Sequence, residues 1–93
     1  MSSDIAKLRT KIDVLDRRIV GLLNRRLGTV ARIGELKAKL GLKSYSKSRT
    51  REILRNVAAA NRGPHSKRQL ERIWRAVVAA SVELQDRHAR PRR

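Results

Sequence analysis

Apolar residues recur at alternating intervals of three and four along the first part of the chain. They are Ile5, Leu8, Ile12, Leu15, Ile19, Leu22, Ile33, Leu36 and Leu40. This seven-residue repeat predicts one helix over about residues 4–40, with Asp4 or a preceding serine as its cap and Gly41 just past its end. Such a helix is ~54 Å long at ~1.5 Å per residue. The remaining chain is too short to cover this stripe, so we expect an intertwined homodimer.

Two shorter helices are expected after a linker at residues 42–45. The first, over about residues 47–61, begins near Ser46 or Ser48 and ends at a turn that contains a Gly-Pro pair. The second, over about residues 67–87, follows Ser66, which with Gln69 fits a capping box. A basic tail over residues 88–93 shows no apolar periodicity. The fold class expected is therefore all-α, with three helices in a single domain over residues 1–93.

The amino-acid composition excludes several kinds of functional site. The chain has no cysteine, which excludes a disulfide scaffold, a cysteine-based zinc site and a thiol nucleophile. No apolar run approaches the ~20 residues that span a bilayer, and the first residues do not resemble a signal peptide, so we expect a cytoplasmic protein without a membrane partner. The formal net charge of +16 indicates an anionic partner, which could be a polynucleotide, a membrane surface or a small acid.

Polar residues interrupt the apolar stripe of the first helix. Its seven-residue count places Arg26 at an inward position, and Lys37, eleven residues later, returns to nearly the same face. A guanidinium removed from water needs an anion, so the two side chains could clamp a small acidic molecule. The alternative is that Arg26 forms a structural ion pair with Glu52 or Glu71.

Two residues of the same segment, Gly28 and Gly34, have no side chain. Gly28 and Gly34 each cost a helix ~1 kcal/mol relative to alanine. Close helix packing is the simpler explanation for both, and contact with a ligand is the alternative. On the third helix, Ser81 and Gln85 lie at i and i+4 on the inward stripe, which favours a small polar pocket inside the helical bundle.

Four segments resemble the all-helical chorismate mutases. They are residues 8–16 (LRTKIDVLD), 22–26 (LLNRR), 33–37 (IGELK) and 81–85 (SVELQ). The resemblance covers about residues 5–86. It implies a three-helix protomer in an intertwined dimer, with two identical sites that rearrange chorismate to prephenate in aromatic amino-acid biosynthesis. This reaction needs no metal and no cofactor, so neither is expected.

The resemblance also implies roles for individual residues. Arg9, from the other protomer, and Arg26 correspond to the carboxylate-binding arginines. Lys37 and Gln85 correspond to the donors to the ether oxygen. Arg49 corresponds to the arginine of the family's Arg-Glu pair, and Ser81 to the serine near the ring carboxylate. Geometry independently separates the two arginines, because Arg9 is ~25 Å along the helix from Arg26 and about 100° around it.

Two positions depart from the family pattern. Ser46 and Thr50 stand where the family usually has Asp and Glu, and that Glu contacts the ring hydroxyl of the substrate. A shifted register would make Arg51 and Glu52 the Arg-Glu pair, but it needs two extra linker residues, so we prefer Arg49. An isochorismate-pyruvate lyase and a mutase of an amino-chorismate remain alternatives.

Functions outside this family fit the sequence less well. The positive charge is spread over all three helices and aromatic residues make up 2% of the chain, so specific nucleic-acid binding is not expected. A purely structural dimerisation module would leave the inward polar residues unexplained. His65 and His88 fall in a turn and in the tail, and we expect neither a catalytic nor a metal-binding role for them. The basic tail could serve a regulatory protein partner.

Overall fold

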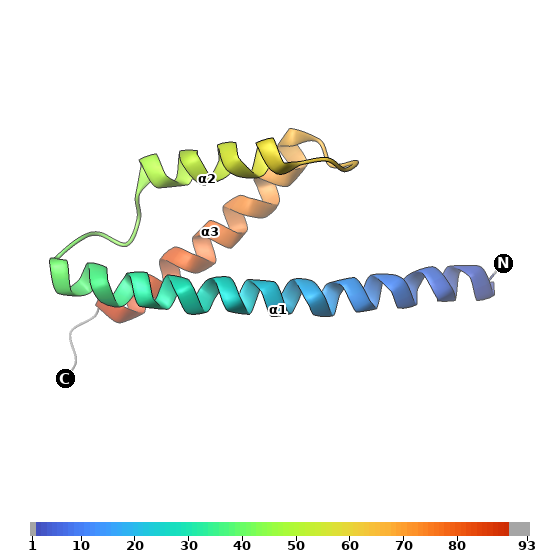
Figure 1. Ribbon diagram of the computed structural model, residues 1–93, viewed down its shortest axis with the longest axis horizontal. Coiled ribbons are helices and arrows are strands. Elements are labelled where there is room, and N and C mark those ends of the chain that lie inside the picture. The colour runs from blue at the N-terminus through green and yellow to red at the C-terminus, as the bar shows by residue number, and fades with distance from the viewer. Residues whose placement is uncertain (1, 90–93) are drawn as a thin grey trace.

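Three helices make up the described part of the protein. The computed structural model describes residues 2–89, with helices α1 (Ser2–Leu40), α2 (Lys47–Ala60) and α3 (Lys67–Ala89) and no strand within that range. The all-α expectation is confirmed. Figure 1 shows α1 as a single long rod, α2 running in the opposite direction and separated from it, and α3 crossing diagonally from α2 to the C-terminal half of α1.

Two helix ends differ from the expected ones. α1 begins at Ser2, so Asp4 lies inside its first turn instead of capping it, and there its carboxylate still faces the positive end of the helix dipole. α3 continues to Ala89, so His88 is helical and does not belong to the tail. Arg87 and His88 in the last turn complement the negative end of the dipole, which favours this extension. Residues 90–93 of the expected tail lie outside the described residues.

Local signals end α1 as the sequence predicts. Gly41 has a φ of 69°, the left-handed conformation that glycine adopts without strain. The Gly41 amide donates to the Ala38 carbonyl at 3.3 Å, and the Leu42 amide donates to the Lys37 carbonyl at 2.8 Å. This pair of bonds is a Schellman motif, which satisfies two of the carbonyls that the helix end leaves free.

The other two helices begin at the serines that the sequence indicates. The Ser46 hydroxyl accepts a hydrogen bond from the Arg49 amide at 3.2 Å and caps α2. Ser66 and Gln69 form the expected capping box, because the Gln69 amide donates to the Ser66 hydroxyl while the Ser66 amide donates to the Gln69 side chain. The Ser46 cap fixes where the linker of residues 41–46 joins α2, and the Ser66 capping box fixes where the turn of residues 61–66 joins α3.

A single chain buries little of its apolar surface. α3 packs against both α1 and α2, and Val30 and Val78, each 8% exposed, are the buried hydrophobic residues among those described. The N-terminal half of α1 extends past the other two helices (Figure 1), and its apolar stripe stays exposed, with Leu8 at 58% and Leu22 at 61%. No helix within residues 2–89 is long and apolar enough to cross a membrane.

Candidate functional site

A cavity of about 340 Å³ lies among the three helices. It is lined by all of the expected site residues except Arg9, namely Arg26, Lys37, Ser46, Arg49, Thr50, Ser81 and Gln85. Val30 and Ile33 of α1, Ile53 of α2 and Val78 and Val82 of α3 form its apolar wall. Its volume is within the range of about 300 to 1,000 Å³ typical of small-molecule sites.

Arg26 enters this cavity from the middle of α1. Its Nη1 donates to the Ser81 hydroxyl, which in turn donates to the Val77 carbonyl one turn back on α3 at 2.9 Å. Burial lowers the pKa of the Arg26 guanidinium, and the positive charge of Arg49 lowers it further. Both causes mean that the charge lacks compensation, which an anion in the cavity would provide.

The carboxylates that could have paired with Arg26 are engaged by other residues. Glu52 forms an ion pair with Arg49, and Glu71 forms one with Arg75 at 2.8 Å. Within residues 2–89, therefore, Arg26 is not held by the structural ion pair that the sequence left open. The described lining of the cavity contains no acidic side chain.

Lys37 lies in the last turn of α1, where the Schellman motif fixes its backbone. Its Nζ donates to the Ser44 carbonyl at 3.1 Å. A lysine ammonium has three N–H donors, so this bond holds the side chain at the cavity and leaves donors for a ligand. Sequence reasoning missed Ser44, because a contact to a backbone carbonyl depends on the path of the linker and has no residue signature.

Gln85 reaches the cavity from α3 at the point where α3 lies close to α1. It is 8% exposed, and its Oε1 is buried without a hydrogen-bond partner among the described residues. A Cβ added at Gly34 would stand 3.2 Å from both Cα and Cγ of Gln85, so this glycine is what lets the two helices approach. A Cβ at Gly28 would meet no atom of the described chain within 4 Å. An unpartnered buried amide oxygen marks a place where a ligand or water belongs.

The first turn of α2 forms the remaining wall. Thr50 Oγ1 donates to the Ser46 carbonyl at 2.9 Å, which leaves the lone pairs of that hydroxyl available to accept. Arg49 lines the cavity, whereas Arg51 lines a separate cavity between α2 and α3. The geometry therefore favours Arg49, and not the shifted Arg51 register, as the arginine of this site.

Arg9 does not join the other expected residues in one chain. It lies on the exposed N-terminal half of α1, among residues that contact neither α2 nor α3 closely enough to be buried. Within one chain it does not line the cavity.

The assembled site is cationic and rich in hydrogen-bond donors. Arg26, Lys37 and Arg49 supply positive charge, and the Gln85 amide and the Ser81 hydroxyl supply neutral polar groups. Such a set binds carboxylates and stabilises negative charge on an oxygen. Residues 2–89 hold no group of three or more histidines, cysteines or carboxylates able to bind a metal ion.

Comparison with known proteins identifies the family. Residues 8–86 match the model of chorismate mutase type II, and the chain belongs to that family. It is 33% identical over 86 residues to the bifunctional chorismate mutase/prephenate dehydratase of Aquifex aeolicus, covering 88% of this chain and 24% of that protein. The T-protein of Enterobacter agglomerans is 37% identical over 54 residues, covering 58% of this chain and 14% of that protein. The chain thus spans a quarter or less of these curated relatives.

Solved structures show the same fold. Chorismate mutase Form II from Thermus thermophilus superposes with a TM-score of 0.86 and 34% identity, covering 89% of this chain and 94% of that one. Form I from the same organism gives a TM-score of 0.78 and 34% identity, with 83% and 96% coverage. The likeness extends over nearly the whole length of these structures.

Proposed function

We propose that this protein is a chorismate mutase, which rearranges chorismate to prephenate in aromatic amino-acid biosynthesis. The observation that carries the proposal is the joint presence of Arg26, Lys37 and Gln85 on one cavity whose described lining contains no carboxylate. Membership of the chorismate mutase type II family supports the same reaction.

The reaction explains the residue types. Chorismate is a dianion, and its [3,3] rearrangement breaks an ether C–O bond while a C–C bond forms, with no proton transfer and no nucleophile from the protein. Catalysis must hold the enolpyruvyl arm over the ring and stabilise the charge that grows on the ether oxygen. Fixed guanidinium groups restrain the two carboxylates, which removes the entropy that a flexible substrate would otherwise lose in the transition state.

In this proposal Lys37 and Gln85 bind the ether oxygen. The Lys37 ammonium keeps donors beyond its bond to the Ser44 carbonyl, and the Gln85 amide is buried and anchored where α3 meets Gly34. Each preorganised donor of this kind is typically worth ~3–4 kcal/mol in the transition state. Arg26, oriented by Ser81, binds a carboxylate.

We further propose a homodimer with a site shared between protomers. The exposed apolar stripe on the N-terminal half of α1 would be covered by a second copy of the chain, as the length of α1 requires. Arg9 lies on this half of the helix, so it would reach the cavity of the other protomer and bind the second carboxylate. A complete site then needs both chains.

Thr50 bears on the choice of substrate. Its hydroxyl is committed as a donor to the Ser46 carbonyl, so it can only accept a hydrogen bond from the ring hydroxyl of chorismate. One neutral acceptor binds a hydroxyl less strongly than a carboxylate does, and we expect weaker substrate binding than with a glutamate at this position.

The test is a product-resolved assay. The purified protein is incubated with chorismate and, separately, with isochorismate, and the products are separated and identified. Prephenate from chorismate supports the proposal, whereas pyruvate and salicylate from isochorismate alone would make the protein a lyase. Arg26→Ala should abolish turnover, while Arg72→Ala, which removes an exposed arginine of α3 that does not line this cavity, should not.

A further inference from the structure

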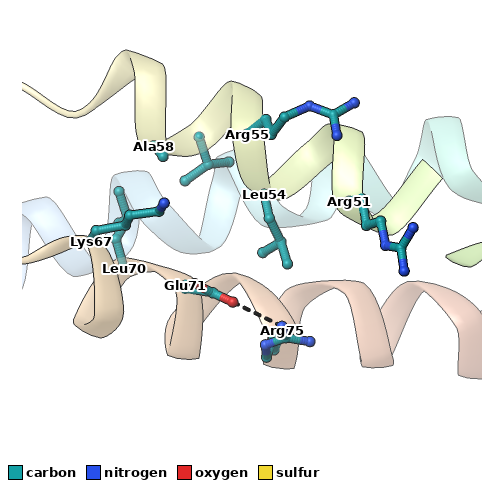
Figure 2. Close-up of a pocket in the computed structure, with 9 residues that line it drawn as sticks. Arg51, Leu54, Arg55, Ala58, Lys67, Leu70, Glu71 and Arg75 are labelled. Carbon is teal, nitrogen blue, oxygen red and sulfur yellow. Dashed lines mark hydrogen bonds and ion pairs between the residues drawn. The ribbon is translucent and has the colours of Figure 1, made fainter. Parts of the chain in front are cut away.

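A second cavity lies between α2 and α3 and shares no lining residue with the candidate active site. It has a volume of about 450 Å³ and is lined by residues of α2 and α3. Figure 2 shows Arg51 and Arg55 projecting from α2, and Lys67 and Arg75 from α3, with the ribbon of α1 passing behind. None of the residues that line it is among those assigned to the mutase reaction.

The charge of this cavity is unbalanced. Arg75 pairs with Glu71 at 2.8 Å, but Arg51, Arg55 and Lys67 have no ion-pair partner among the described residues. Four cations and one carboxylate leave an excess of three positive charges around one hollow. Arg51 and Arg55 are also four residues apart on one helix, where like charges repel each other. An anion bound between them would relieve this repulsion.

The floor of the cavity is apolar. Leu54 of α2 and Leu70 of α3 both line it, and both are only half-buried. Lys67 and Leu70 lie together at the end near the α2–α3 turn, Leu54 and Arg75 lie near the middle, and Arg51 lies at the opposite end (Figure 2). A ligand that fits this arrangement combines a charged group with an apolar body.

We propose that this cavity binds an amphipathic organic anion, with a doubly charged head group held by Arg51, Arg55 and Arg75 and an apolar body packed on Leu54 and Leu70. The ligand would bridge α2 and α3. No residue in the described range of α2 is fully buried, so this helix is held weakly by its own packing. Binding to the folded state alone stabilises that state by mass action, so occupancy should raise the melting temperature.

The lining of this cavity comes from α2 and α3 and contains none of the residues assigned to the mutase reaction. The inference therefore does not depend on the proposed reaction. It can be tested by binding, without any measurement of activity.

The probe is 1-naphthyl phosphate, titrated calorimetrically into the full chain at fixed ionic strength. Inorganic phosphate supplies the charge alone and 1-naphthol the apolar body alone. We expect one naphthyl phosphate per protomer, bound at least about tenfold more tightly than either part, because only the whole molecule uses both the arginines and the leucines. Equal affinity for inorganic phosphate would reduce the cavity to a patch of general positive charge and overturn the proposal.

Variants locate the binding. The double change Arg51→Gln and Arg55→Gln should weaken naphthyl phosphate by about tenfold or more, since it removes two charge-assisted contacts. Arg72→Gln removes an exposed arginine outside this cavity and should change the affinity by less than about twofold. Circular dichroism checks that each variant folds. If Arg26→Ala weakens binding and the double variant does not, the probe occupies the first cavity and the proposal is wrong.

Discussion

The close approach of α1 and α3 at Gly34 allows a sharp test of how the site is built. A Cβ at this position would stand 3.2 Å from the Gln85 backbone Cα and 3.2 Å from its Cγ, and 3.4 Å from Cδ2 of His88. The backbone atom cannot move without moving α3. Gly34→Ala should therefore push α3 away from α1 and shift Gln85 relative to Lys37.

The magnitude follows from two opposing effects. Replacing a glycine inside a helix by alanine gains ~1 kcal/mol of helix propensity. Forcing a methyl group into a close contact typically costs ~1–3 kcal/mol. Gly34→Ala should consequently lower the free energy of unfolding by between about 0 and 2 kcal/mol. Gly28→Ala is the matched control, because its Cβ would meet nothing within 4 Å in the described chain and it should raise the free energy by up to ~1 kcal/mol.

Urea unfolding at one fixed protomer concentration measures both variants against the parent chain. The concentration must be fixed because the stability of a dimer depends on it. Turnover of chorismate is measured on the same samples. We expect kcat of Gly34→Ala to fall by at least about tenfold, since a displacement of ~1 Å in a catalytic group can cost about a hundredfold. Gly28→Ala should keep the parent kcat.

The outcome that would refute this reasoning is specific. If Gly34→Ala stabilises the protein as much as Gly28→Ala does and leaves kcat unchanged, the two helices are not in contact through Gly34. The placement of Gln85 would then have another cause.

Four further predictions follow from the site. Arg26→Ala should lose at least about a hundredfold in kcat/KM while the free energy of unfolding stays equal or rises. Burial and the Arg49 charge depress the Arg26 pKa, so the charged form of Arg26 opposes folding at every pH below that depressed value. If the variant instead unfolds while activity per folded molecule is unchanged, Arg26 has a structural role. Gln85→Glu should gain activity only as the pH falls, because the introduced carboxyl must be protonated to donate a hydrogen bond. The activity of the parent protein should stay constant through mildly alkaline pH. If the activity of the variant does not depend on pH, Gln85 does not bind the ether oxygen. Sedimentation should show a dimer at micromolar concentration, and Ile12→Asp should dissociate it; a stable parent monomer would end the role of Arg9. Thr50→Glu should lower KM for chorismate. It should not lower stability, because a carboxylate in the first turn of α2 interacts favourably with the helix dipole. An unchanged or lower kcat/KM would show that Thr50 does not face the ring hydroxyl.

The helices and their local ends can be predicted from the order of the residues alone. The glycine at position 41 and the serines at 46 and 66 act through hydrogen bonds within about five residues, and the seven-residue stripe of α1 follows from helix periodicity alone, so all of them can be identified without the fold. The same holds for Arg26 in the stripe of α1 and for Ser81 and Gln85 in that of α3. A polar residue at an apolar position of a regular repeat is visible in the sequence, and the structure brings these three to one cavity.

The way in which the helices meet depends on packing between distant parts of the chain. The crossing of α3 over α1 assigns Gly34 to close packing against Gln85, and the linker path brings the Ser44 carbonyl to Lys37. The rotation of α2 about its axis turns Arg49 to one cavity and Arg51 to another. These features depend on packing between residues far apart in the chain, which a local pattern does not specify. The length and the exposed stripe of α1 are the basis for the dimer that we propose, whose contacts would form between two chains.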